Sequence, residues 1–192
     1  MTLFNFSQIV DRVLGSPETE PGSAGAMIDP LTRLPTRPAV VRELKHRLDK
    51  AHGKQPIGLI IIDFSNVQGL VENGDSVKPD LLIRLARMLT SRVPDYVVGR
   101  MRDREFAVIV PGKSLPDVER VANEVIAAVR SDELPESERR FIATIVGIGY
   151  SSRGDCKAPQ LMSLADIALH YALATGRGSH TIVDSVPAHR AA

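Results

Sequence analysis

The sequence predicts an α/β (α+β) domain in which helices flank a central mixed sheet. Stretches with apolar residues every three or four positions alternate along the chain with short runs of valine and isoleucine, a pattern typical of helices packed on a sheet. The segment VVGRMRDREFAVIV (97–110) carries two such runs in immediate succession, which indicates a β-hairpin. The alternation and the antiparallel hairpin together favour a mixed sheet.

Each element follows from its local pattern. Helical periodicity is clearest in residues 115–129, where one face gathers the apolar positions Val118, Val121, Ala122, Val125, Ile126 and Val129. The same periodicity predicts helices at 39–51, shortly after Asn66, at 80–91 and at 161–175. Strands are expected where apolar and β-branched residues adjoin, at 57–63, in the two hairpin arms, at 141–148 and around Thr181.

Residues 1–27 precede the predicted domain. Apolar residues recur there at roughly helical spacing, and residues 15–25 are rich in proline, glutamate, serine and glycine. We expect a short amphipathic helix that caps the folded domain or a sister subunit, followed by a flexible linker. Membrane attachment is the weaker alternative, because Arg12 is the only basic residue on the polar face of this helix. One folded domain is expected over 28–184, with a frayed tail at 185–192.

Composition narrows the class of protein. The chain has 192 residues, 43% hydrophobic and 24% charged, enough for one well-filled domain. A net charge of +1 gives no reason to expect a nucleic-acid partner. The single cysteine, Cys156, excludes an internal disulfide, and the longest apolar run (57–62) is too short to span a bilayer. We therefore expect a soluble cytoplasmic protein without membrane insertion.

The tip of the predicted hairpin is unusual. Residues 101–104 contain neither the glycine nor the asparagine that tight hairpin turns prefer, and they place Arg102, Asp103 and Arg104 in succession. A turn of this kind needs another explanation than local turn propensity.

Four motifs explain this turn, because together they resemble a known protein family. DPLTRLPTR (29–37), LIIIDFSN (59–66), RMRDREFAVIV (100–110) and ADIALHYALATGRG (165–178) follow one another in the order and at the spacing found in GGDEF domains, the diguanylate cyclase family. The resemblance covers residues 28–184. It implies a fold like the palm of nucleotidyl cyclases, with the signature on a β-hairpin. In active members two domains each hold one GTP and join them into cyclic di-GMP with two divalent metal ions.

The signature itself departs from the family pattern. Gly-Gly-Asp/Glu-Glu-Phe aligns so that Arg102 and Asp103 replace the glycines and Arg104 replaces the first acid, whereas Glu105 and Phe106 match. Glycine lets the backbone approach a nucleotide, because it has no Cβ. The first acid contributes to metal binding, which requires a hard anionic oxygen that arginine lacks.

Further positions are mixed. By the resemblance, Asp63 matches one metal-binding aspartate, while Ser65 stands in place of the second. Asp80 matches the aspartate that reads guanine, but Val71 replaces its asparagine partner. Arg177 matches a phosphate-binding arginine.

Leucine at position 173 replaces the family's phosphate-binding lysine. Purely structural roles stay open for the matching residues. Asp63 is a candidate cap for the following helix and Asp80 a favourable first-turn acid. Glu105 and Phe106 suit hairpin pairing and core packing, and Arg177 suits a solvated helix end.

A regulatory site is the remaining candidate. The family often carries Arg-x-x-Asp before the signature, where arginine and aspartate bind cyclic di-GMP as an inhibitory product. RVPD places Arg92 and Asp95 in this pattern, one residue further from the signature than usual. Arg100 and Asp103 satisfy the same pattern, and an ordinary charged surface loop is the alternative.

The resemblance and its departures lead to one functional expectation with two alternatives. We expect a catalytically inactive GGDEF-like signalling domain that acts as a cyclic di-GMP receptor or a protein-interaction module, with a protein partner or a second copy and no required cofactor. An active diguanylate cyclase, which would need magnesium, is the first alternative. A nucleotide-independent scaffold that docks through the N-terminal helix and the hairpin is the second.

Overall fold

The computed structural model describes residues 26–65, 71–72, 76–131, 134–175 and 180–184. The predicted N-terminal helix, Arg177, the tail at 185–192 and residues 66–70, where a short helix was expected, lie outside the described residues. The division into segment, domain and tail stays a prediction.

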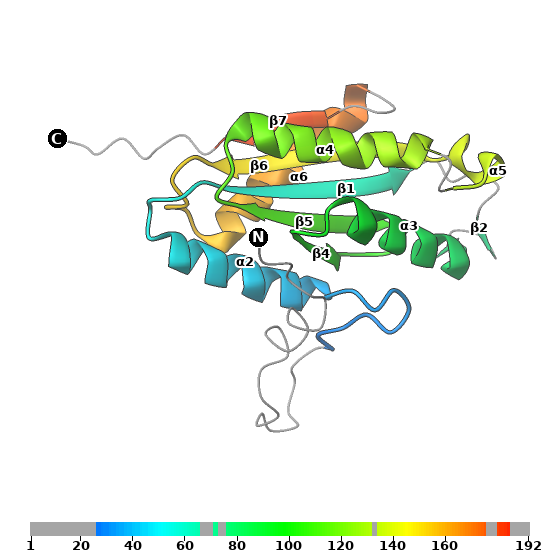
Figure 1. The fold of residues 1–192 in the computed structure, drawn as a ribbon, viewed down its shortest axis with the longest axis horizontal. Helices are drawn as coiled ribbons and strands as arrows, with labels where there is room; N and C mark the ends of the chain where they lie inside the picture. The colour runs from blue at the N-terminus through cyan, green and yellow to red at the C-terminus, as the bar shows by residue number, and fades with distance from the viewer. Residues whose placement is uncertain (1–25, 66–70, 73–75, 132–133, 176–179, 185–192) are drawn as a thin grey trace.

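A five-stranded sheet forms the centre of the domain, in the order β4-β5-β1-β6-β7 (Figure 1). Its strands are β4 (Val97–Arg100), β5 (Glu105–Pro111), β1 (Ile57–Ser65), β6 (Ala143–Ser151) and β7 (His180–Asp184). The pair β6–β7 is parallel and the other neighbours are antiparallel, so the predicted mixed sheet is confirmed. Two short strands, β2 (Val71–Glu72) and β3 (Ser76–Val77), pair separately and were not predicted.

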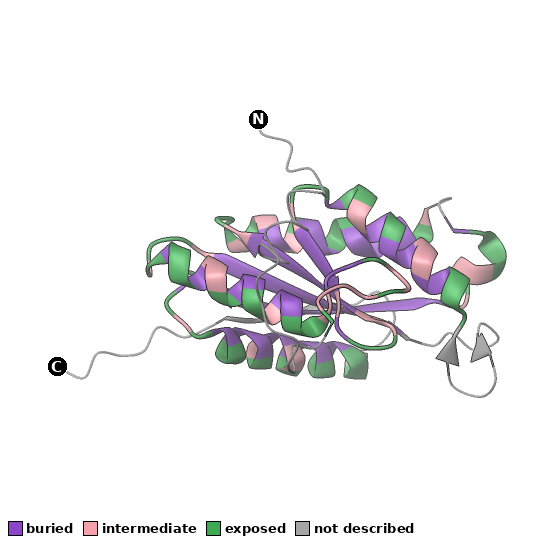
Figure 2. Ribbon diagram, turned by 90° about the horizontal axis from the view of Figure 1, so that it is seen from below, coloured by how far each residue is buried: buried purple, intermediate pink, exposed green. Residues whose placement is uncertain are grey.

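Helices cover both faces of the sheet, and Figure 2 shows buried strands between helices whose outward turns are exposed. One face carries α2 (Arg37–Ala51) and α6 (Ala158–Thr175), and the other carries α3 (Pro79–Arg92) and α4 (Leu115–Arg130). A single turn, α5 (Glu136–Arg139), precedes β6. Of the helices assigned among the described residues, none has both the length and the hydrophobicity needed to cross a bilayer.

Strict alternation along β1 sets the two cores. Ile60, Ile62 and Phe64 pack toward α3 and α4, whereas Leu59 and Ile61 pack toward α2 and α6. Successive side chains of a strand point to opposite faces. Asp63 therefore belongs on the face that α2 and α6 cover, near the end of the central strand.

Close contact between β6 and α6 depends on glycine. A Cβ at Gly147 would lie 2.3 Å from the carbonyl oxygen of Ala165 and 2.3 Å from the amide nitrogen of Leu169. Both atoms belong to the α6 backbone, which cannot move aside as a flexible side chain can. Gly147 thus lets α6 lie directly on the sheet.

This contact gives a stability prediction. We expect Gly147→Ala to lower the free energy of unfolding by about 3 kcal/mol, the upper part of the usual range for overpacking, because the added methyl group meets backbone. The matched control is Gly112→Ala, where φ is +68° and nothing lies within 4 Å of the added Cβ. It should cost about 1–2 kcal/mol for the left-handed backbone alone. Urea unfolding followed by circular dichroism measures both, and an equal or smaller loss for Gly147→Ala would contradict the packing argument.

Candidate functional site

The hairpin tip joins Arg100 at the end of β4 to Glu105 at the start of β5, as predicted. The amide of Met101 donates to the carbonyl of Glu105 at 2.7 Å, and the amide of Arg102 donates to the same carbonyl at 3.3 Å. Among the described non-glycine residues only Arg33 and His52 have positive φ. The tip therefore turns through ordinary backbone conformations and does not require glycine.

The side chain of Arg100 holds this tip in place. Its guanidinium donates to both carboxylate oxygens of Asp29, at 3.1 and 3.0 Å. It also donates to the backbone carbonyls of Asp103 at 2.9 Å and Arg102 at 3.3 Å. One partly buried side chain thus ties the tip to the loop that precedes α2.

The acceptor Asp29 is itself fixed by Thr32, whose amide and hydroxyl donate to Oδ2 at 2.8 and 2.6 Å. Burial raises the pKa of Asp29, but these hydrogen bonds and the Arg100 guanidinium lower it more, so the pKa lies below its ordinary value. The carboxylate stays charged, as the paired arginine requires.

Two further carboxylates face each other across the central strands. Asp63 of β1 pairs in register with Glu105 of β5, on the face covered by α2 and α6. Their side chains are only 16% and 13% exposed. Directly opposed side chains in an antiparallel pair lie about 5 Å apart at Cβ, where like charges are destabilising. This juxtaposition requires positive charge nearby.

Arginines of the tip supply that charge. Nε of Arg104 lies 3.4 Å from Oδ1 of Asp63, and Nε of Arg102 lies 3.6 Å from Oε2 of Glu105. The amide of Phe64 donates to the Arg104 carbonyl at 3.3 Å, which fixes the tip beside β1. The Arg104 contact is an ion pair without hydrogen-bond alignment, since Asp63 Oδ1 is buried and has no hydrogen-bond partner.

Compensation at Glu105 is incomplete. Burial raises the pKa of Glu105, the guanidinium of Arg102 opposes the rise, and the carboxylates of Asp166 and Asp63 reinforce it. Arg37, the first residue of α2, opposes it more weakly. The site is therefore a small cluster of partly buried acids beside the arginines of the hairpin tip.

This arrangement does not fit the pair of divalent metal ions that the resemblance implies. Such ions need several hard oxygen ligands, and the part of the chain that the structure describes contains no group of three or more histidine, cysteine, aspartate or glutamate side chains placed to hold one. The Arg104 guanidinium occupies the surroundings of the one matching aspartate, Asp63.

Other predicted site residues have simpler surroundings. Asp80 is exposed in the first turn of α3, where its charge suits the helix dipole. Asp63 is not a helix cap, because β1 continues through Ser65, so that interpretation is wrong. Phe106 packs edge-on against Phe64, with ring centroids 5.6 Å apart, as a core residue. Leu173 is exposed on α6.

Arg92 and Asp95 lie at the opposite end of β4 from the tip. Arg92 is the last residue of α3 and Asp95 lies in the short loop before β4, and both are exposed. Arg100, which together with Asp103 satisfies the same sequence pattern, contacts Asp29 and the carbonyl of Asp103.

Three residues that contribute to the site, Asp29, Arg37 and Asp166, were not predicted from the sequence. Asp29 and Arg37 belong to the motif DPLTRLPTR, and Asp166 belongs to ADIALHYALATGRG. The motifs identified the segments, but their charges meet the hairpin only through the tertiary fold.

With this geometry in place, comparison with known proteins assigns the class. Residues 26–179 match the family model described as diguanylate cyclase, GGDEF domain. The chain therefore belongs to the GGDEF family, and the predicted resemblance is confirmed.

Relatives agree with this assignment. The probable diguanylate cyclase DgcE of Escherichia coli (strain K12) is 25% identical over 166 residues, which cover 84% of this chain and 15% of that protein. The chain thus spans only about 15% of the length of this curated relative.

Solved structures show the same fold. The GGDEF domain of DgcB from Caulobacter crescentus, in complex with cyclic di-GMP, superposes with a TM-score of 0.70 at 24% identity, covering 84% of this chain and 98% of that one. The diguanylate cyclase SiaD of Pseudomonas aeruginosa, in complex with its activator SiaC, superposes with a TM-score of 0.69 at 25% identity, covering 83% of this chain and 62% of that one.

The raised pKa of Glu105 gives a pH prediction. The folded state binds this proton more tightly than the unfolded chain, so stability falls as pH rises from the ordinary value of 4.5 through the raised one. We expect Glu105→Gln to raise the melting temperature at pH 7 and to lose this advantage below pH 4. Calorimetry from pH 3.5 to 8 tests it.

The control is Glu136→Gln, which removes the same charge from an exposed position in α5. An exposed glutamate should show little change at either pH. A melting temperature for Glu105→Gln that is lowered at pH 7 would mean that its pairing with Arg102 outweighs the burial of its charge.

Proposed function

We propose that this GGDEF domain does not synthesise cyclic di-GMP and instead acts in cyclic di-GMP signalling, as a receptor for the dinucleotide or as a protein-interaction module. The ion pair between Arg104 and Asp63, at 3.4 Å, is the observation that carries the proposal. A cation attached to the hairpin takes the position where catalysis would need metal ions.

The physical argument begins with charge. A guanidinium is permanently protonated and has no acceptor for a metal. It both neutralises Asp63 and repels a divalent ion. The backbone of Arg104 is anchored to Phe64 and the tip is held by Arg100, so the hairpin keeps this arginine beside Asp63.

Residues at the positions that bind GTP in the family also argue against catalysis. Arg102 and Asp103 place side chains where the family has glycine, and Val71 and Leu173 replace polar partners of GTP. Removing a single group that stabilises the transition state costs about a hundredfold to a thousandfold in rate. Several such losses leave no useful turnover.

Two exposed surfaces could bind a ligand or a partner, namely the arginines of the hairpin tip and the outer side of α6. The side chains of Arg102 and Arg104 are 60% and 43% exposed, so the rim presents donors to an external anion. The large apolar side chains that the described part of the chain exposes are Ile167, Tyr171 and Leu173, all on α6. Ile167 and Tyr171, four residues apart, lie on the same side of this helix, and exposed apolar side chains that adjoin one another support a protein contact.

Relatives support both halves of the proposal. DgcB binds cyclic di-GMP and SiaD binds a protein activator. In this chain the dinucleotide would be held by Arg92, donating to a phosphate oxygen and a guanine edge, and by Asp95, accepting from the base. Neither contact needs a metal ion.

The absence of synthesis is directly testable. We expect the purified protein, incubated with GTP and magnesium or manganese, to yield no cyclic di-GMP above background in a chromatographic assay. Arg104→Glu alone should also yield none, because Val71, Leu173 and the occupied glycine positions are unchanged.

The matched control for this assay is Asp63→Ala, which removes the remaining metal-binding aspartate. Product formed by the wild type and lost in Asp63→Ala would establish the active-cyclase alternative. Full activity in Arg104→Glu would show that the other substitutions are tolerated.

Ligand binding separates the receptor from the scaffold. We expect cyclic di-GMP to bind without magnesium and Arg92→Ala to weaken binding about ten- to a hundredfold, since a hydrogen bond to a charged group contributes about 1.5–3 kcal/mol. Asp95→Ala should also weaken it. Isothermal titration calorimetry measures both.

Arg87→Ala is the control for this titration, because Arg87 is an exposed arginine on the same helix. Its affinity should equal that of the wild type. No heat at high micromolar cyclic di-GMP would refute the receptor and leave the nucleotide-independent scaffold.

A further inference from the structure

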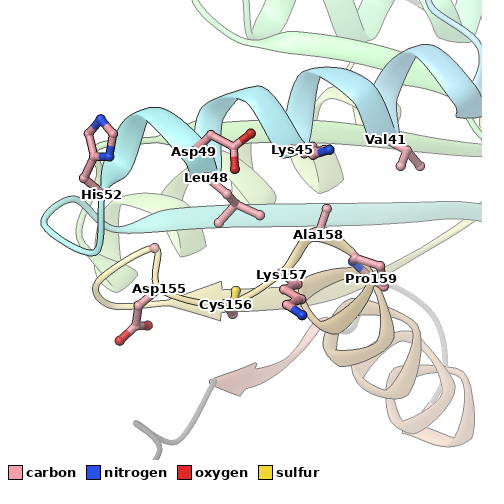
Figure 3. A pocket seen from close by; sticks show the side chains of 11 residues that line it. Val41, Lys45, Leu48, Asp49, His52, Asp155, Cys156, Lys157, Ala158 and Pro159 are labelled. Carbon is pink, nitrogen blue, oxygen red and sulfur yellow. The ribbon is translucent and has the colours of Figure 1, made fainter.

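A groove of about 710 Å³ lies between α2 and the loop that leads from β6 into α6 (Figure 3). Leu48 and Ala158 form buried parts of its wall, and Val41 and Cys156 are half-buried in it. The lining is mainly apolar. Lysines and aspartates stand at its rim, including Lys45.

This groove is separate from the hairpin site. It contains the last turn of α2 and the loop after β6, where β1 begins, whereas Asp63 lies near the other end of β1. An occupant of the groove would leave the Arg104–Asp63 pair uncovered.

The α2 wall has the spacing of a helix-binding surface. Val41, Lys45 and Leu48 follow one another at intervals of four and three residues and so share one side of α2, and His52 continues this stripe as the C-cap of the helix. At 1.5 Å per residue this stripe is about 16 Å long. A short amphipathic helix of about eleven residues has the same length.

We propose that residues 4–14 of this same chain dock in the groove as an amphipathic helix. Their sequence, FNFSQIVDRVL, predicts a helix with one apolar face, and a helix this short is marginal in water unless that face is buried. The groove offers a surface of matching length within the same molecule, with Leu48, Ala158 and Cys156 as its apolar floor and charged side chains at its rim.

The linker can make this connection. Ala26 is held beside the start of α2, because its carbonyl accepts a hydrogen bond from the Thr36 hydroxyl at 2.6 Å. Residues 15–25 can extend over about 36 Å, whereas α2 with its 15 residues is about 22 Å long. The linker therefore reaches every part of the groove, and a short tether keeps the local concentration of the segment high.

Cys156 makes the proposal testable, because it is the only cysteine in the chain and lies in the groove. We expect Val10→Cys, in the middle of the predicted apolar face, to form an intrachain disulfide with Cys156 when copper phenanthroline removes two electrons and two protons from the thiols. Burial raises the pKa of the Cys156 thiol, so the oxidation is run at pH 9 to supply thiolate. Non-reducing electrophoresis and peptide mass mapping identify the product.

Arg12→Cys is the matched control, because Arg12 lies on the polar face of the predicted helix. It should cross-link at least tenfold more slowly. Equal rates in the two variants, or no disulfide in Val10→Cys, would overturn the proposal. A disulfide between two chains only would also overturn it and assign the groove to a second copy.

A second measurement needs no new cysteine. In the full-length protein, N-ethylmaleimide should alkylate Cys156 about tenfold faster in Val10→Asp than in the wild type, the factor that corresponds to losing the burial of one apolar side chain. Gln8→Asp, on the polar face, should leave the rate unchanged. An unchanged rate in Val10→Asp would refute docking, and neither result bears on cyclic di-GMP binding or synthesis.

Discussion

Two largely covered carboxylates, Asp63 and Glu105, oppose each other across the central strands, and the contacts of the hairpin tip offset the repulsion between them. Their positions follow from the register of β1 and β5 and from the alternation that buries the neighbouring isoleucines. Neither side chain can turn outward without moving its whole strand. Positive charge is therefore needed beside them, and Arg104 and Arg102 of the hairpin tip provide it through ion pairs.

The composition of the tip has a physical reason in this charge balance. Glycines would leave the acids uncompensated unless metal ions were bound. With arginines in the turn, the cation belongs to the chain itself, and the tip needs its own support, which Arg100 gives through Asp29 and the carbonyls of Arg102 and Asp103. Asp29, with its lowered pKa, keeps that support charged at neutral pH. The site thus comprises three ion pairs, Arg100–Asp29, Arg102–Glu105 and Arg104–Asp63, joined through the backbone of the hairpin tip.

Local patterns in the sequence were sufficient for most of the fold, and they were insufficient for the charges of the site. The hairpin, the central strand and helix 115–129 have periodicities that span many residues, and all three are present in the structure. The four residues of α5 and the two-residue strands β2 and β3 are too short to show any period. Asp29 and Arg100 are 71 residues apart, and no local signal predicts such a contact. The family motifs located the segments that meet at the site, but strand register decides which side chains face one another.

The resemblance aligns Arg104 with a metal-binding acid, and an arginine at this position would also change what the site can bind. A guanidinium has five N–H donors, and the carboxylate of Asp63 can engage at most two of them, so at least three remain for solvent or a partner. Because 43% of the Arg104 side chain and 60% of the Arg102 side chain are exposed, these donors are accessible on the outer side of the tip. A metal ion in the same place would polarise a phosphate and activate a nucleophile. A tethered guanidinium can hold a carboxylate or phosphate but supplies no activated nucleophile, so under the proposed function Arg104 both opposes metal binding and offers its outer donors to an anion.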